Sequence, residues 1–265
     1  MSSNGAPKIL LITGAARRIG AAIATLFHAR GYDVVIHFNT SAQQAKALVD
    51  GFNTLRPNSA CCLQADLGAV SAVHDLATAA LAWRGGVDVL INNASRFYPG
   101  ALGGVDEAAW DDLINSNLKG GFFLAQALAP SLRERHGCII NLTDIHADGA
   151  RQGYPVYSIA KAGVKMMTKA LARELAPQVR VNGISPGAIL WPEAEQSEKE
   201  QSEAQRAVLQ DIALQRMGSA QEIAATAWYL AEDAAYCTGQ TIRVDGGRTQ
   251  SQSLIPNYVK GALDA

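Results

Sequence analysis

A tyrosine and a lysine four residues apart are the pair in this sequence best suited to joint acid–base chemistry. If the segment is a helix, Tyr157 and Lys161 lie one turn apart and point the same way. The lysine ammonium would then lower the pKa of the phenol, because it stabilises the phenolate. A phenol tuned in this way is a usable general acid. The same spacing also occurs by chance on surface helices, so the surrounding motifs decide its meaning.

A glycine-rich segment near the start of the chain could bind phosphate. Residues 13–20 are Thr-Gly-Ala-Ala-Arg-Arg-Ile-Gly, and small residues after a strand let backbone amides and a helix N-terminus approach a pyrophosphate. For this segment taken alone, a tight turn without a ligand is the alternative. The candidate cofactor contacts here are Gly14, Arg17, Arg18, Ile19 and Gly20.

The choice between NAD(H) and NADP(H) depends on the end of the second predicted strand, where NAD-binding folds usually carry an acidic residue. Residues 37–41 are His-Phe-Asn-Thr-Ser and contain no acid. Arg17 and Arg18 stand beside the phosphate region, and guanidinium groups match phosphate oxygens in charge and geometry. NADP(H) is therefore favoured, although both arginines could be solvated at a helix start. Asn39, Thr40 and Ser41 are further candidate contacts.

More candidate cofactor contacts follow the later predicted strands. Asp66 and Leu67 come after the third strand, and Asn93-Ala94-Ser95 comes after the fourth, where an adenine and ribose would lie. Thr143 ends the fifth strand, and Pro186-Gly187 follows the sixth. Polar residues at strand ends are also ordinary turn formers, which is the alternative for Asp66 and for residues 93–95.

Short β-branched runs alternate with longer amphipathic stretches along the chain. The predicted strands are Lys8–Thr13, Asp33–Phe38, Ala60–Gln64, Val87–Asn92, Gly137–Thr143, Gln178–Ile184 and Thr241–Val244. The predicted helices are Ile19–Arg30, Ser41–Asn53, Val70–Trp83, Glu107–Arg133, Val156–Leu175 and Ala220–Asp233. This alternation predicts an α/β, Rossmann-type, doubly wound fold whose seven parallel strands carry helices on both faces. Ligands bind such sheets at the carboxyl ends of the strands, where these motifs fall.

The whole chain, residues 1–265, is expected to form one domain. Residues 8–92 form its mainly cofactor-binding half, and residues 93–248 form its catalytic and substrate half. The polar segment 190–215 breaks the alternation and is interpreted as a substrate lid. Residues 249–265 form a tail too short to be a domain, which could pack at a subunit interface.

The composition limits the classes of function that the protein can have. Hydrophobic residues make up 48% of the chain and charged residues 18%, with no apolar run long enough to span a bilayer and no signal peptide at the start. We therefore expect a soluble, cytoplasmic protein. The balance of 23 basic and 24 acidic residues gives no reason to expect nucleic-acid binding. The four cysteines lack metal-ligand spacing, so no metal site is predicted.

The order of these motifs resembles the short-chain dehydrogenase/reductase family over roughly residues 8–248. By that resemblance Tyr157 is the catalytic acid, Lys161 also bonds the nicotinamide ribose, and Asn117 completes a proton relay. The resemblance also implies a homotetramer. His37 and His146, near strand ends, are expected to be structural or solvated rather than catalytic.

One departure from the family pattern concerns the substrate. Thirteen residues before the tyrosine, where most relatives have a serine, this chain has Asp144. An ionised carboxylate only accepts hydrogen bonds, so it would repel the charge that develops on a ketone oxygen. It suits instead a nitrogen heterocycle that offers N–H groups. The substitution resembles the pteridine reductases, as do Arg18 and the segments 93–99 and 187–193.

That resemblance implies an NADPH-dependent reduction of a dihydropterin, or of dihydrofolate, to its tetrahydro form. Phe97 would stack on the pterin ring. The implied substrate contacts are Arg18, Ser95, Phe97, Asp144, Tyr157, Leu190 and Trp191. Two alternatives remain open: a carbonyl reductase, such as a ketoacyl reductase, in which Thr143 replaces the usual serine, and a non-catalytic NADP-binding sensor.

Overall fold

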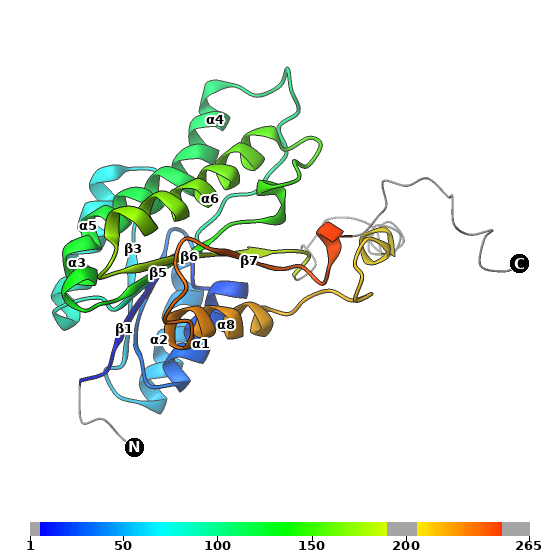
Figure 1. The fold of residues 1–265 in the computed structure, drawn as a ribbon. Helices are drawn as coiled ribbons and strands as arrows, with labels where there is room; N and C mark the ends of the chain where they lie inside the picture. Colours follow the sequence, from blue (N-terminus) through cyan, green and yellow to red (C-terminus); the bar gives the residue numbers. More distant parts are fainter. Residues whose placement is uncertain (1–5, 190–205, 251–265) are drawn as a thin grey trace, which may run out of the picture.

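A computed structural model describes residues 6–189 and 206–250 (Figure 1). Its centre is a seven-stranded parallel sheet with the strand order β3-β2-β1-β4-β5-β6-β7. The strands are β1 (Ile9–Ile12), β2 (Asp33–Phe38), β3 (Ala60–Gln64), β4 (Val89–Asn92), β5 (Cys138–Leu142), β6 (Arg180–Pro186) and β7 (Thr241–Val244). The predicted fold class is confirmed. The strand order reverses between β1 and β4, the point at which such sheets bind ligands.

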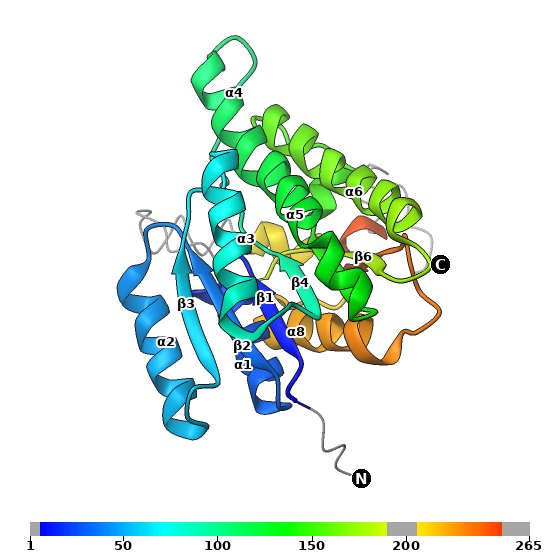
Figure 2. The ribbon, with the colours of Figure 1, turned by 90° about the vertical axis from the view of Figure 1, so that its left-hand side faces the viewer.

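Helices cover both faces of the sheet, as Figures 1 and 2 show. One face carries α1 (Arg18–Ala29), α2 (Ala42–Leu55) and α8 (Ala220–Trp228). The other carries α3 (Val70–Arg84), α5 (Gly120–Glu134) and α6 (Pro155–Leu175). Helix α4 (Glu107–Ile114) extends beyond the sheet at the start of α5. Among the described residues, no helix combines the length and apolar character needed to cross a bilayer.

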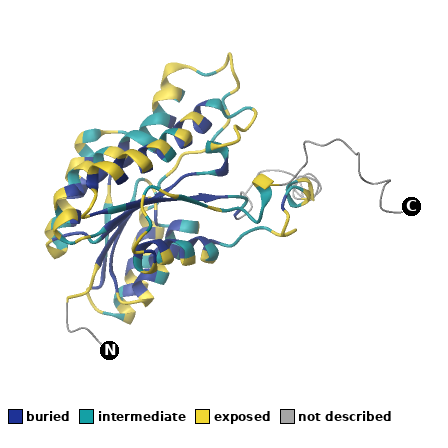
Figure 3. Ribbon diagram, viewed as in Figure 1, coloured by how far each residue is buried: buried dark blue, intermediate teal, exposed yellow. Residues whose placement is uncertain are grey.

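Alternate residues of the central strands pack into two separate cores. On β1, Leu10 and Ile12 face the core under α1, α2 and α8, whereas Ile9 and Leu11 face the core under α3, α5 and α6. All four are buried, which is typical of a parallel strand covered on both faces. Figure 3 shows this as a dark buried sheet between helices whose outer faces are exposed. The apolar runs thus fix the site-bearing strand ends in a rigid layer.

The predicted helix 107–133 is interrupted, which corrects that boundary. A π-helical turn, η1 (Asn115–Lys119), joins α4 to α5 without breaking the helical path. The Asn117 side chain donates to the Leu113 carbonyl one turn earlier, at 2.9 Å. Side chains that bond to the preceding carbonyls disturb regular helical pairing, and π-helical turns often occur at functional sites.

Strand β6 begins and ends two residues later than predicted, because its last residue, Pro186, pairs with Val244 of β7. The helix predicted over 220–233 likewise ends in a π-helical turn, η3 (Tyr229–Asp233). Of the predicted lid, residues 190–205, which include Leu190 and Trp191, lie outside the described residues, as do residues 251–265 of the tail.

Candidate active site

A cleft of about 1120 Å³ opens at the carboxyl ends of the strands. Every predicted site residue within the described ranges lines it except Asn117. Residues from the glycine-rich turn and the end of β2 line one part, and the segments after β4 and β5 and the start of α6 line another. Elements far apart in the sequence therefore converge on one site, as the parallel topology requires.

The glycine-rich turn is held close to the segment after β4. Gly14 has φ of +61°, in the left-handed region that favours glycine. A Cβ atom at this position would lie 2.8 Å from the Ala94 Cα, so a larger residue would clash. The Asn93 Nδ2 donates to the Thr13 and Gly14 carbonyls at 2.9 and 3.0 Å. The turn is thereby fixed with its backbone facing the cleft.

His37 holds the same turn from the other side, a role that its sequence position did not reveal. The Gly14 amide donates to His37 Nδ1 at 3.1 Å, so this nitrogen is the acceptor. The other ring nitrogen, Nε2, lies 3.1 Å from the Ala65 carbonyl and must carry the proton. Burial lowers the pKa of His37 to about 4. The ring is therefore neutral and structural, as expected, and it supports the cofactor turn.

Arg17 and Arg18 lie exposed at the N-terminus of α1, where no side chain caps the first turn. Within the described part of the chain, neither arginine has a carboxylate at ion-pair distance. Arg18 has φ of +55°, a conformation that costs a non-glycine residue roughly 1–2 kcal/mol. Two uncompensated cations and uncapped helix amides favour an anionic ligand at this place.

The Tyr157 hydroxyl donates to Asp144 Oδ2 at 2.7 Å. The second carboxylate oxygen accepts from the His146 amide at 2.8 Å and caps a short 3₁₀ turn, η2 (Ile145–Ala147). Burial raises the pKa of Tyr157, and the Asp144 charge and hydrogen bond raise it further. The expectation of a phenol whose pKa is lowered by Lys161 is therefore wrong for the protein alone. A carboxylate, not the ammonium, is the direct partner of the phenol.

Lys161 lies on the same face of α6 as Tyr157, with its ammonium 5.7 Å from the centre of the phenol ring. The side chain is buried, and its Nζ donates to the Leu142 carbonyl at 3.0 Å. Burial lowers the pKa of Lys161 to about 8, against a smaller raising effect of Asp144. An ammonium carries three donors. Leu142 is its one acceptor among the described residues, so two donors remain for a ligand.

Asn117 reaches the site indirectly. Its Oδ1 accepts a hydrogen bond of 2.6 Å from the Ser95 hydroxyl, and its Nδ2 donates to the Arg96 carbonyl at 3.0 Å. Ser95 thus links Asn117 to the cleft, which Ser95, Tyr157 and Asp144 all line.

Aromatic rings form the wall beside the phenol. The Phe97 ring stacks on Tyr154 with centroids 4.6 Å apart and planes at 9°, and it meets Tyr157 edge-on at 4.8 Å. Arg151 lies over both Phe97 and Tyr154. Arg151 and Tyr154 were not among the predicted site residues, because they lie in the irregular segment before α6. Stacking of Phe97 on a pterin stays a prediction.

Thr143, which stands beside Asp144, is the residue that would replace the usual serine in a carbonyl reductase. Its hydroxyl is buried and donates to the Ile184 carbonyl at 3.0 Å. That bond joins the ends of β5 and β6. A threonine hydroxyl has one proton to donate, so the proton of Thr143 is directed to the backbone rather than into the cleft.

Known proteins resemble this chain along almost its entire length. The family model described as enoyl-(acyl carrier protein) reductase matches residues 14–249. The 3-oxoacyl-(acyl-carrier-protein) reductase FabG of Staphylococcus epidermidis is 37% identical over 91% of this chain and 98% of that protein. Pteridine reductase 1 of Leishmania tarentolae is 34% identical over 93% of this chain and 98% of that protein.

A solved structure described as a blue fluorescent protein from a metagenomic library in complex with NADPH is also similar. It matches with a TM-score of 0.83 and 31% identity, over 91% of this chain and 97% of that chain. The match therefore supports the assignment of the fold.

Proposed function

The chain belongs to the short-chain dehydrogenase/reductase superfamily, and we propose that it is an NADPH-dependent reductase of a pterin-type substrate. One observation carries the proposal: the Asp144 carboxylate accepts the hydrogen bond of the Tyr157 hydroxyl and lines the cleft. A carboxylate at this place offers acceptors to the ring and amino N–H groups of a pterin.

NADP(H) is the cofactor, and the local chemistry fits it. The Gly14 turn admits a close backbone approach, and no acidic residue follows β2 to repel a ribose phosphate. Arg17 and Arg18 supply two cations for phosphate oxygens, and the buried Lys161 has donors to spare for ribose hydroxyls. When bound, NADPH supplies the hydride and is converted to NADP⁺.

The residues of the chain handle the proton and the orientation of the substrate. Asp144 accepts hydrogen bonds from the N–H groups of the pterin and so sets its position. When the carbon of the C=N bond gains a hydride, the electron pair of that bond moves to the nitrogen, which then takes up a proton. The Tyr157–Asp144 pair, which shares one proton over 2.7 Å, delivers it. The positive charge of Lys161 offsets the negative charge left on this pair.

A carbonyl reductase is the second candidate, because the similar Staphylococcus epidermidis protein is a 3-oxoacyl-(acyl-carrier-protein) reductase. One observation counts against it: the Thr143 hydroxyl is already bonded to the Ile184 carbonyl. A negative carboxylate would also oppose the alkoxide that forms during ketone reduction.

NADPH oxidation, followed by its absorbance, separates the candidates. Dihydrobiopterin, dihydromonapterin and dihydrofolate are compared in parallel with an acetoacetyl thioester. We expect at least one dihydropterin or dihydrofolate to be turned over with a higher kcat/KM than the thioester. Turnover of the thioester alone would refute the pterin assignment, and no turnover of any substrate would favour a non-catalytic NADP-binding role.

The enzyme is further proposed to act as a homotetramer. Large apolar side chains remain exposed on the outer helices of the monomer: Trp110 on α4, Phe122 on α5, and Ile159 and Met166 on α6. Exposed apolar residues gathered on neighbouring helices favour an interface between copies. Light scattering after size-exclusion chromatography tests this, and a monomer mass at micromolar concentration would contradict it.

A further inference from the structure

Arg151 lines the cleft beside the aromatic rings of Phe97 and Tyr154. We propose that Arg151 binds an anionic group on the tail of the substrate, so that the enzyme selects substrates whose tail carries a carboxylate or a phosphate. The inference deepens the proposed function. Only the part of its test that uses pterin and folate substrates rests on that function.

The guanidinium is held in place by aromatic rings. Its central carbon lies 4.6 Å from the centre of the Tyr154 ring and 5.5 Å from the centre of the Phe97 ring. The backbone around it is also fixed, because the Tyr154 amide donates to the Arg151 carbonyl and the Arg151 amide donates to the Ser158 hydroxyl. A stacked guanidinium keeps its N–H edge for a bidentate anion, and its orientation is already set.

The charge of Arg151 is not compensated by a carboxylate in the described ranges. Two other arginines of the same cleft differ in this respect. Arg96 pairs with Asp112, and Arg248 lies 3.9 Å from the carboxylate of Asp211. Arg151 is thus an exposed cation, stacked in place, with no anionic partner in the part of the chain that the structure describes.

Arg151 lies close to the reacting group, because the Phe97 ring that it covers meets the Tyr157 ring edge-on at 4.8 Å. Burial is the main cause of the raised pKa of Tyr157, and the positive charge of Arg151 is among the effects that lower it. A substrate ring beside Tyr157 would therefore have its tail within reach of the aromatic wall. The exposed part of Phe97 offers an apolar surface to such a tail, and the Arg151 guanidinium lies over the same ring.

Two pairs of substrates with different tails test the proposal. Dihydrofolate carries carboxylates on its tail, and dihydrobiopterin carries none. Acetoacetyl-coenzyme A carries phosphates, and acetoacetyl-N-acetylcysteamine is its uncharged counterpart. For Arg151→Gln we expect kcat/KM to fall about 10- to 100-fold on the anionic member of the active pair, mainly through KM. The fall on the neutral member should be at least tenfold smaller.

Two further variants serve as controls. Arg151→Lys keeps the charge and should recover most of the loss on the anionic substrate. Arg96→Gln removes a cation that Asp112 already compensates, and should affect the anionic and neutral members by the same factor. Equal losses for both members in Arg151→Gln would indicate a merely structural role and overturn the proposal, as would no loss on the anionic one. If only the thioesters are reduced, the pterin assignment fails while the coenzyme A pair still tests Arg151.

Discussion

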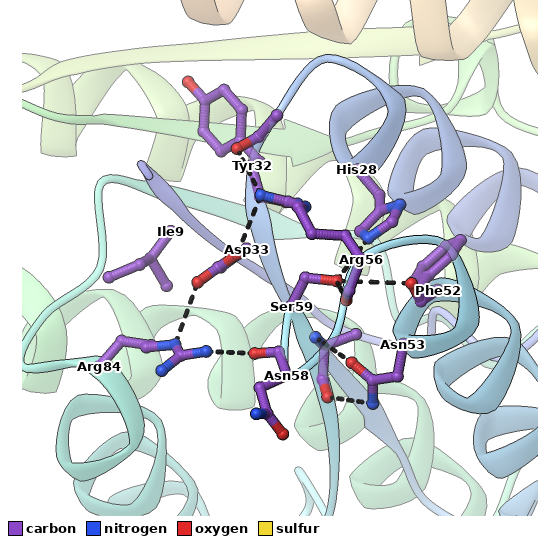
Figure 4. Close-up of polar contacts among 12 residues, drawn as sticks. Ile9, His28, Tyr32, Asp33, Phe52, Asn53, Arg56, Asn58, Ser59 and Arg84 are labelled. Carbon is purple, nitrogen blue, oxygen red and sulfur yellow. Dashed lines mark hydrogen bonds and ion pairs between the residues drawn. The ribbon is translucent and has the colours of Figure 1, made fainter. Parts of the chain in front are cut away.

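Charged side chains gather at both ends of the parallel sheet, and the two ends differ in whether these side chains have partners of opposite charge. At the amino ends, near β2, the buried Asp33 carboxylate binds Arg56 at 3.2 Å and Arg84 at 3.0 Å (Figure 4). Both arginines also donate to backbone carbonyls of the adjoining loops, among them that of Asn58. Every charge of this cluster, the amino-end cluster, thus has a partner.

At the carboxyl ends, the same kinds of charged group lack partners of opposite charge among the described residues. Asp144 bonds to a phenol instead of a cation, and the buried ammonium of Lys161 has a single backbone acceptor. Arg17 and Arg18 have no described carboxylate partner. Groups with partners stabilise the fold, whereas groups held in place without them are available for ligands. Substitutions at the two ends should therefore change different quantities.

The largest expected effect is that of Asp144→Ser on substrate choice. Removing the carboxylate takes away the acceptor for N–H groups and frees the Tyr157 proton for a carbonyl. We expect kcat/KM for the dihydropterin to fall about 10³-fold and that for the acetoacetyl thioester to rise. Steady-state kinetics on both substrates measure this. Loss of both activities together would show that Asp144 maintains the fold of the site rather than its specificity.

The next effect is a pH dependence at His37, at the carboxyl end. Burial lowers its pKa from 6.5 to about 4, so its neutral form stabilises the fold. That contribution is complete above pH 6.5, the unfolded value, and is lost as pH falls through 4. It amounts to about 3 kcal/mol. Urea unfolding measures the free energy of unfolding of wild type and His37→Gln at pH 7 and at pH 4. Between these pH values, wild type should lose about 3 kcal/mol more than the variant. Equal losses in the two proteins would contradict the prediction.

Asp33→Asn tests the amino-end cluster. It leaves Arg56 and Arg84 without their carboxylate, and the free energy of unfolding should fall by about 2 kcal/mol because both arginines are partly exposed. The kcat should stay unchanged, since the cluster lies at the opposite end of the sheet. The matched control is Lys8→Gln, which removes the more exposed ion pair with Glu232 and should cost less than about 1 kcal/mol. A fall in kcat for Asp33→Asn would show that the two ends are coupled.

The smallest effect is that of Arg18→Gly, which sharpens the comparison because it should change stability and binding in opposite directions. Glycine relieves the left-handed backbone at this position and should raise the free energy of unfolding by about 1 kcal/mol. The affinity for NADPH should fall about tenfold, with a smaller change for NADH. Thermal unfolding and cofactor titration measure the two quantities. A parallel fall in stability and NADPH affinity would contradict the assignment.

Much of the cleft could be predicted from the sequence because parallel topology brings strand ends together. Gly14, Asn93 and Tyr157 come from distant segments, yet each follows a strand or begins the helix after one, and all line the cleft. The cleft residues that could not be predicted are those whose role depends on the direction in which their side chains point. Arg151 and Tyr154 precede α6 in an irregular segment without a periodic pattern, so nothing in the sequence placed them against Phe97.

The sequence alone determined the seven strands, the helical faces and the types of residue at the strand ends, because periodicity and local chemistry are properties of the chain itself. The tertiary structure decided the protonation of those residues. Burial, and not spacing, raises the pKa of Tyr157 beside Asp144 and lowers that of Lys161. Desolvation depends on which distant segments cover a group, and only the folded chain determines that.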